Sequence, residues 1–558
     1  MKRHTILLAA VLATAAVSAQ DLSKNITIER DYTPTLRAAT RLENFPQLVQ
    51  PSIADSRLQF SDMTTASAVP GMIAVLPAAS SGPAIAISPY RGYASLGYFP
   101  AFNLGASAGY SIIAKPTTRL NAWLQYDGNS YKTTFPGFDD KLTLKRHTFT
   151  VGVDFTNVFR GAGRLDINTF YTLNSYNRPW TGSDKNTSFG QFDFKAVWSA
   201  RKAQIGYYVG ADFGISSFGK VDAVFAVNPL VDKLSETDFG FKGGVAYFIG
   251  SSSSLALNAS ADFSRFSHFN ALMPDAGPSE IQPVVGNART IGVITLAPAY
   301  RLRDDNLKVR IGLKSQFNSN SGKTFHLAPD VRLDYNVDET ARLYASFTGG
   351  QHINTLSSLF NVTPYLSPSL AYLNSSVPVD AEIGVMFGPF KGFSVGLHGG
   401  YAVANDWLMP TFDYDTYIFE STDLRAVKGG IDLRWQYRDL LTLTADAEFA
   451  PGSYKHASYL NRDRAKAVVN AGVTVNPVKN LTVDAGWHLR SGRSAYLSDG
   501  SRYGLGTSSE LSIGGRYTFT PQLSVFLEVE NLLDSRPELL PYLQAQGIKG
   551  LAGVSFKF

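Results

Sequence analysis

The sequence predicts an all-β protein, a closed antiparallel β-barrel of about 22 strands that crosses a lipid bilayer. Apolar residues alternate with small or polar ones in stretches that recur from position 91 to the last residue. Most stretches approach the length at which a tilted strand spans a bilayer, about 9–11 residues. The connections between them are alternately short and long. A membrane barrel explains this alternation of short and long connections, because its short turns lie at one rim and its long loops at the other.

The two strands predicted at 102–112 and 120–126 show the alternation most clearly. Every second position of the first strand is apolar: Phe102, Leu104, Ala106, Ala108, Tyr110 and Ile112. A turn-like run at 115–118 leads to a second alternating strand at 120–126. Successive side chains of a strand point to opposite faces, so both strands have one apolar face and one that is mostly small or polar. Hydrocarbon cannot hydrogen-bond to the backbone, and such strands must therefore close on themselves, with the apolar face toward lipid.

Further strands of the same kind are predicted up to the C-terminus. In chain order the full set is 92–99, 102–112, 120–126, 147–155, 165–175, 192–200, 204–215, 239–249, 255–263, 291–302, 309–317, 327–335, 343–347, 381–387, 393–401, 424–437, 441–449, 467–475, 481–489, 511–519, 525–531 and 550–558. A count of 20 would require one pair of these strands to be wrong, and the weakest prediction is 92–99, which is short and carries no long loop.

The connections fix the orientation of the strands. Short connections fall at 159–162, 201–202, 250–252, 304–306, 337–340, 389–392, 438–439, 477–480 and 520–522. All of them except 201–202 contain a Gly, Pro, Asn or Asp residue, as is typical of tight turns. Long connections fall at 132–144, 177–187, 217–236, 268–289, 354–379, 405–422, 452–462, 492–506 and 533–549. This phase predicts an even number of strands and places both chain ends at the short-turn rim, which faces the periplasm in a Gram-negative outer membrane.

The N-terminus predicts export. Lys2, Arg3 and His4 precede an apolar run at 6–17, which is too short for a membrane-spanning helix. Residues 1–19 are therefore expected to be a signal peptide that is cleaved between Ala19 and Gln20. Residues 20–90 are rich in proline and carry only fragments of a strand pattern. We interpret them as a periplasmic extension or a partial occluder of the lumen, with a disordered leader as the alternative, and assign 91–558 to the barrel.

Composition excludes several classes of function. The absence of cysteine excludes disulfides, iron–sulfur clusters and thiol catalysis. The net charge of +5 becomes +3 without Lys2 and Arg3 of the leader, which is too small to indicate a nucleic-acid partner. The eight histidines show no metal-binding spacing, and neither a G-x-S-x-G motif nor a phosphate-binding loop occurs. No catalytic, cofactor or metal site is therefore assigned, and the chain is not expected to be an enzyme.

The C-terminal strand carries a more specific pattern. Val554, Phe556 and Phe558 share one face, and the chain ends on an aromatic residue. This resembles the C-terminal signal by which bacterial outer-membrane barrels are recognised for assembly. The resemblance implies that the assembly machinery and outer-membrane lipid are partners of the chain.

Charged residues on the polar faces of the strands are candidates for the lumen wall. Their mixed signs favour cross-strand ion pairs over a selectivity ring of one sign, and simple solvation of the wall is the alternative. The candidates are Arg164, Asp166, Asp193, Lys308, Arg310, Lys314, Asp330, Arg332 and Asp334.

The last third of the chain resembles the barrel of TonB-dependent receptors of the Bacteroidetes type. The run Val529-Glu530-Asn531-Leu532-Leu533-Asp534 is similar to the penultimate-strand motif of that family. The run Pro364-Tyr365-Leu366-Ser367-Pro368, followed by Glu382-Ile383-Gly384, is similar to a second family segment. The resemblance implies a barrel of about 22 strands. That family carries a plug domain of well over a hundred residues, whereas here about 70 residues precede the first strand and show no plug-like pattern. The short run 26–29 resembles a TonB-coupling box only weakly, and an ordinary edge-strand fragment is its other interpretation.

Three hypotheses for function follow. The first is an outer-membrane transporter or channel for a polar solute, receptor-like but without a full plug. The second is a barrel that anchors a complex in the membrane, in which residues 20–88 or the long loops bind periplasmic or surface lipoproteins. TonB is the partner that the resemblance to the receptor family implies. The third is an outer-membrane hydrolase, for which no serine–histidine pair can be nominated.

Overall fold

The computed structural model describes residues 90–100, 103–136, 138–181, 186–219, 235–267, 290–319, 323–366, 374–413, 416–450, 465–497 and 500–558. The predicted signal peptide, its cleavage site at Ala19 and Gln20, and nearly all of the predicted extension at 20–90 lie outside these residues.

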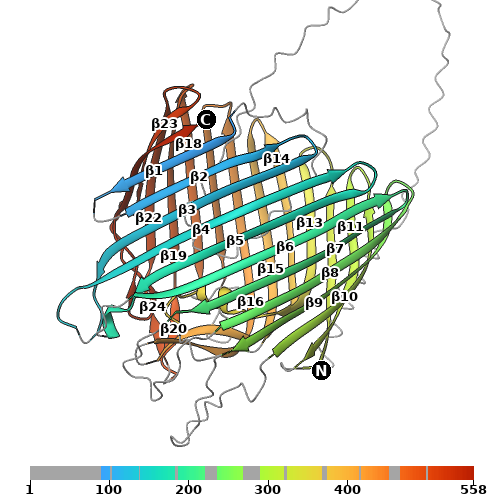
Figure 1. Cartoon of the computed structure of the whole chain (residues 1–558), viewed down its shortest axis with the longest axis horizontal. Helices are drawn as coiled ribbons and strands as arrows, with labels where there is room; N and C mark the ends of the chain where they lie inside the picture. Colours follow the sequence, from blue (N-terminus) through green and yellow to red (C-terminus); the bar gives the residue numbers. More distant parts are fainter. Residues whose placement is uncertain are drawn as a thin grey trace, which may run out of the picture. The chain divides into compact units, whose positions relative to one another are not determined.

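Twenty-two strands form one closed antiparallel barrel (Figure 1), which confirms the predicted fold class and strand count. β1 (Gly92–Phe99) pairs on one side with β2 (Asn103–Ala114) and on the other with β26 (Lys549–Lys557), so the sheet has no open edge. The alternative count of 20 is therefore wrong. The other barrel strands are β3 (Thr118–Thr133), β4 (Leu142–Phe159), β5 (Gly163–Asn177), β6 (Asn186–Lys202), β7 (Ile205–Phe218), β8 (Ser235–Ile249), β9 (Ser253–Ser267), β10 (Thr290–Arg303), β11 (Leu307–Ser319), β12 (Phe325–Asn336), β13 (Ala341–His352), β14 (Ser375–Phe390), β15 (Phe393–Asp413), β16 (Thr416–Tyr437), β17 (Leu441–Phe449), β18 (Ala467–Val478), β19 (Leu481–Ser491), β22 (Ser508–Thr518) and β23 (Leu523–Glu530).

The two faces of the barrel wall differ as the alternation predicts. On β11, Ile311, Leu313 and Phe317 are 55%, 49% and 50% exposed, whereas Gly312 and Gln316 on the opposite face are buried. Apolar surface of this extent is unfavourable in water, at about 25 cal/mol per Å². The outer face is thus the surface expected of a barrel that contacts lipid. Among the described residues, neither helix is long and apolar enough to span a bilayer.

The rims differ in the length of their connections. Every connection from an even-numbered strand between β2 and β18 to the next strand is a tight turn, and so is the connection from β22 to β23. The long connections, such as those after Phe218, Ser267 and His352, all lie at the opposite rim. The backbone N–H of Arg91 donates to the carbonyl oxygen of Phe558 at 2.7 Å. Both described ends of the chain therefore lie at the short-turn rim.

Several predicted loops contain regular structure. The prediction of a loop at 405–422 is wrong, because β15 and β16 continue there as one long hairpin. Their pairing is interrupted by a bulge between Ala404 and Trp407. The alternation ends on β15 because residues 408–412 are packed on both faces of that strand. The other elements inside the long connections are η1 (Pro179–Thr181), α2 (Leu356–Phe360), β20 (Ser494–Leu497), β21 (Arg502–Gly504), β24 (Glu538–Leu540) and β25 (Leu543–Gln544).

Closure of the barrel allows no side chain at Gly553. A Cβ atom there would lie 2.3 Å from the carbonyl oxygen of Leu96 and 2.7 Å from the Cα atom of Gly97, both backbone atoms of β1. We expect Gly553→Val to disrupt the β1–β26 seam and to lose 1–3 kcal/mol or more, on the order of an overpacking penalty. The folded fraction on unheated denaturing gels and the urea unfolding midpoint would measure this loss.

The matched control is Gly515→Val on β22, where an added Cβ meets nothing within 4 Å. This variant should fold like the wild type. Equal folding of both variants would show that the seam does not depend on close approach at Gly553.

Candidate functional site

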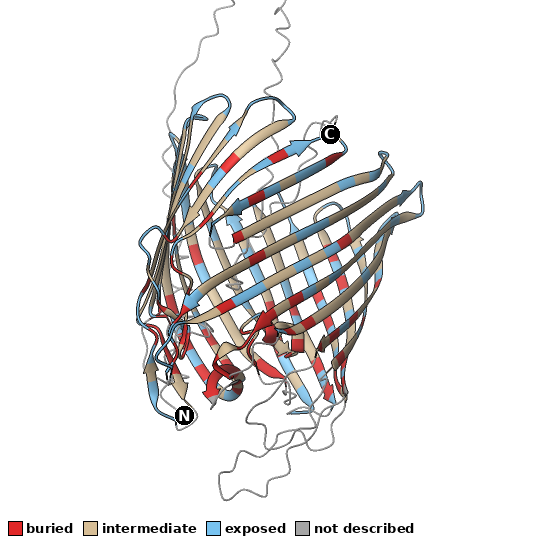
Figure 2. Ribbon diagram, turned by 60° about the vertical axis from the view of Figure 1, so that its left-hand side comes forward, coloured by how far each residue is buried: buried red, intermediate tan, exposed pale blue. Residues whose placement is uncertain are grey.

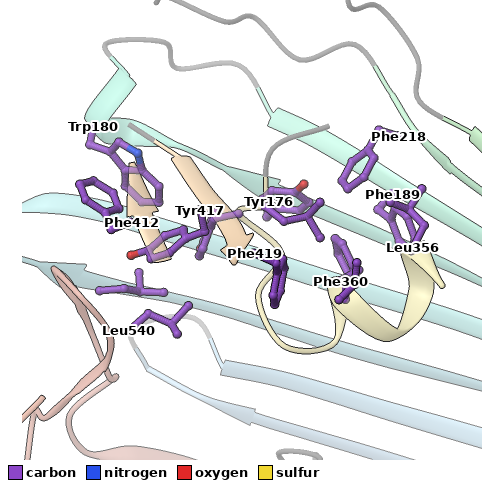
Figure 3. Close-up of a cluster of buried hydrophobic side chains, with 14 of the residues drawn as sticks. Tyr176, Trp180, Phe189, Phe218, Leu356, Phe360, Phe412, Tyr417, Phe419 and Leu540 are labelled. Carbon is purple, nitrogen blue, oxygen red and sulfur yellow. The ribbon is translucent and has the colours of Figure 1, made fainter. Parts of the chain in front are cut away.

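Inside the long-loop rim, side chains from distant parts of the chain form a hydrophobic cluster, which we call the mouth cluster (Figure 3). Figure 2 shows buried residues, coloured red, gathered at this end of the barrel. Its buried members come from strands of the wall and from segments that fold inward from the rim. They are Phe135, Leu144, Tyr176, Trp180, Phe189, Phe218, Leu356, Leu359, Phe360, Tyr365, Leu366, Leu408, Phe412, Tyr417, Phe419, Leu540 and Leu543.

The first inward segment is the tip of the β15–β16 hairpin. Residues 408–412 are buried without interruption, which shows that both faces of β15 are packed at this end. Its bulge contains Asp406, a non-glycine residue with a φ of 54°. Beyond the bulge, Phe412 pairs with Leu497 of β20, and the hydroxyl of Tyr417 donates to the carbonyl oxygen of Pro541 at 2.6 Å. The hairpin therefore leaves the barrel wall and lies across the mouth.

The second inward segment is 353–366, which contains α2. The Thr355 side chain caps this helix by accepting the N–H of Ser358 at 3.1 Å. The ring of Phe360 stacks on Phe189 of β6 with centroids 4.0 Å apart. These contacts fix the helix against the inner wall.

Polar contacts hold the same segment at three more points. The N–H of Leu356 donates to the carboxylate of Glu236, which is fully buried on β8. The hydroxyl of Ser357 donates to Gln191 at 2.7 Å, and the Nη2 atom of Arg178 donates to the carbonyl oxygen of Leu366 at 2.8 Å. A buried polar group without a hydrogen-bond partner is unfavourable, so these bonds stabilise the segment in its position against the wall.

The third inward segment is 531–548, which begins within the family-like motif at 529–534. Asn531 is buried, and its side-chain amide donates to the carbonyl oxygens of Ser535 and Gln546 at 2.6 and 3.0 Å. The Gln546 side chain in turn bonds to Asn103 at 3.0 Å. The hydroxyl of Tyr131 donates to Gln544. The asparagine of the motif thus organises the last long loop against the first strands.

Two loop tyrosines of this region have raised pKa values. Burial raises the pKa of the Tyr365 hydroxyl well above its ordinary value. Burial, and then a 3.0 Å hydrogen bond from its hydroxyl to Glu538, raises the pKa of Tyr503 to about 12. Both hydroxyls are therefore neutral at physiological pH.

The polar side chains of the wall form the second part of the site. Arg164 pairs with Asp166 at 2.7 Å, Arg310 pairs with Asp330 at 2.5 Å, and Asp334 pairs with Arg342. In the first two pairs both residues were predicted as lumen charges. In the third pair only Asp334 was predicted, and Arg342 was not.

The remaining predicted charges have other surroundings. Lys314 donates to the carbonyl oxygen of Gly349 at 2.8 Å, and Asp193 accepts from Gln191 at 2.6 Å. Within the described ranges, Lys308 and Arg332 have no carboxylate within ion-pair distance. The structure thus does not bring all nine predicted charges together in one group.

The wall contains other ion pairs whose residues were not predicted from the sequence. Lys428 is buried between Glu382 at 2.8 Å and Glu448 at 3.6 Å, and Lys242 pairs with Asp212 at 3.1 Å. All of them alternate with outward apolar residues, so position along the strand could have found them. Which residues become partners depends on the register between strands. The part of the chain that the structure describes has no group of three His, Cys, Asp or Glu residues that could hold a metal ion.

The predicted assembly residues lie at the seam of the barrel. Val554 and Phe556 point outward at 47% and 43% exposure, and Phe558 lies beside Tyr110 with ring centroids 6.1 Å apart. The outward face is accessible to a partner, and its recognition by the assembly machinery stays a prediction.

Comparison with known proteins places this geometry among solved barrels. No family model and no curated protein matches the sequence. The structure is similar to the ferric enterobactin receptor PfeA of Pseudomonas aeruginosa, with a TM-score of 0.61 and 12% identity over 84% of this chain and 80% of that one. The chain has the fold of that receptor.

Two other solved structures are similar to the same extent. The siderophore receptor PirA of Acinetobacter baumannii matches with a TM-score of 0.61 and 10% identity, and the copper transporter OprC with 0.59 and 12%. Both matches cover 84% of this chain and 80% of the other. At such low identity the likeness extends to the fold, while the mouth cluster and the wall charges are described from this chain's own residues.

We expect Phe360→Ala to loosen the mouth cluster. The ring is 2% exposed and stacked on Phe189, so its removal should cost the segment about 3–5 kcal/mol. Amide hydrogen exchange of 356–366 in detergent should accelerate, while exchange in β13 should not change.

The control is Phe347→Ala, because Phe347 is 43% exposed on the outer face of β13. It should leave exchange in 356–366 unchanged. Equal protection in the Phe360 variant would contradict a packed, closed mouth.

The raised pKa of Tyr503 predicts a change at high pH. Its folded pKa of about 12 exceeds the unfolded value of about 10, so the stabilisation is present below pH 10 and is lost as pH rises through 12. The difference in tyrosinate absorbance between wild type and Tyr503→Phe should therefore titrate near pH 12. A difference titrating near pH 10 would show that the hydroxyl is not shielded.

Proposed function

We propose that the protein is an outer-membrane transport barrel of the TonB-dependent receptor type, which admits a polar solute through its lumen. One observation carries this proposal. Aromatic residues pack together at the mouth inside the barrel, and the wall beyond them is lined with charged and polar side chains. A barrel that served only as an anchor would need neither feature. The likeness to solved siderophore and copper receptors supports the same class.

The proposal includes an orientation and partners. In a Gram-negative outer membrane, the short-turn rim and both chain ends would face the periplasm, and the mouth cluster would face the outside. Residues 20–90 would then be in reach of the lumen, as an occluder, and of TonB or lipoprotein partners. The motifs at 364–368, 382–384 and 529–534 favour a receptor of the Bacteroidetes type.

Planar-bilayer conductance tests the proposal. Wild-type protein should conduct weakly, and Phe360→Ala should raise the open probability because it loosens the mouth. Phe347→Ala should behave like the wild type. Removal of 20–88 should raise conductance as well if that segment occludes the lumen.

The proposal fails if folded protein with both changes, Phe360→Ala and removal of 20–88, still conducts nothing. Stoichiometric partners co-purifying with such a sealed barrel would instead favour an anchor or a subunit of a membrane complex.

A further inference from the structure

Three arginines lie directly opposite one another on neighbouring strands of the wall. Arg301 of β10 faces Arg310 of β11, and Arg310 faces Arg332 of β12 in the register of the sheet. All three alternate with outward apolar residues such as Tyr300 and Ile311, and they therefore belong to the inner face. β10 and β11 run side by side in Figure 1. Like charges in directly opposed positions destabilise a sheet unless something compensates them.

The inner face of β10–β13 is strongly basic as a whole. Seven basic residues share it with two acidic ones, Asp330 and Asp334. The basic residues are Arg301, Arg303, Lys308, Arg310, Lys314, Arg332 and Arg342.

Both acidic residues already have partners. Asp330 is 3% exposed and accepts from the Nε atom of Arg310 at 2.6 Å, while Asp334 pairs with Arg342. Over the described residues, Arg301 and Arg332 have no carboxylate within 4.0 Å. The Nε atom of Arg301 is buried and makes no hydrogen bond in this part of the chain. Asp330 is the nearest source of negative charge for Arg301 and it already pairs with Arg310, so two guanidinium groups of the row have no ion pair of their own among the described residues.

The basic character is local to this sector of the wall. The inner face of β14–β17 carries more acidic than basic residues: Asp380, Glu382, Asp432, Asp446 and Glu448 against Lys428 and Arg434. A basic sector beside an acidic one attracts an anion to a defined place, in contrast to a wall of evenly mixed charges.

We propose that Arg301, Arg310 and Arg332, with Lys314 beside them, form an anion-binding site for a small solute that carries phosphate or carboxylate groups. A planar guanidinium group donates two parallel hydrogen bonds to either group, and a bound anion would relieve the repulsion along the row. Arg332 is exposed and Arg301, Arg310 and Lys314 are partly exposed, so a solute can reach them. The inference rests on the proposed function, which places a solute in the lumen, and it names the class of that solute.

Isothermal titration calorimetry on the full chain in detergent tests the site. The probes are inorganic pyrophosphate and citrate, each measured against sodium chloride at equal ionic strength. Wild type should bind at least one probe, and Arg301→Gln and Arg332→Gln should each weaken binding about tenfold, as expected for one charge-assisted hydrogen bond. Binding of pyrophosphate alone assigns phosphate, and binding of citrate alone assigns carboxylate.

The control is Arg164→Gln, an arginine of the same wall that is already paired with Asp166. It should bind the probes like the wild type. A second readout is the melting temperature without ligand, which should rise in Arg332→Gln because repulsion in the row decreases, whereas loss of a purely structural arginine would lower it.

Absence of binding by folded wild type, or equal weakening by Arg164→Gln and Arg332→Gln, overturns the anion site. Because binding is measured without a membrane, such a result leaves the conductance test untouched. Conversely, a barrel that binds pyrophosphate but never conducts would contradict the proposed transport and would still support the anion-binding site.

Discussion

The structure depends on the closure of one hydrogen-bonded ladder. Every strand edge must be paired because lipid offers the backbone no partner, and the β1–β26 seam completes this pairing. Closure requires bare backbone at Gly553, where two strands approach too closely for a side chain. Once the ladder closes, each strand must present one face outward and one inward, which separates the apolar belt from the polar wall.

Closure also creates an inner space that the chain uses in two different ways. At the long-loop rim, three segments fold inward and build an apolar cluster inside an otherwise polar barrel. Below it, charged residues of the wall meet in pairs or, at β10–β12, in a row of like charge. The first arrangement is a packed apolar cluster at the long-loop rim, and the second is a basic row that we propose binds anions.

The inward segments show why some parts escaped prediction from the sequence. Residues 408–412 carry no alternation because both of their faces are packed, and a local pattern of this kind reads as a loop. Their partners are also remote: Tyr417 bonds to Pro541, 124 positions away, and Arg178 bonds to Leu366, 188 positions away. The arginine row could not be predicted either, because the sequence shows each arginine only as one residue on the polar face of a strand. The register between the strands decides that the three lie opposite one another.

The sequence by itself determined the number of strands, the face that each strand turns outward, and the rim at which the turns lie. These features follow from a two-residue period and from tight-turn chemistry, both of which are local properties of the chain. Only the tertiary structure decided which charges of the wall became partners, that Arg301, Arg310 and Arg332 face one another, and that the β15–β16 hairpin lies across the mouth. Those outcomes depend on register and on contacts between distant segments, which no local pattern encodes.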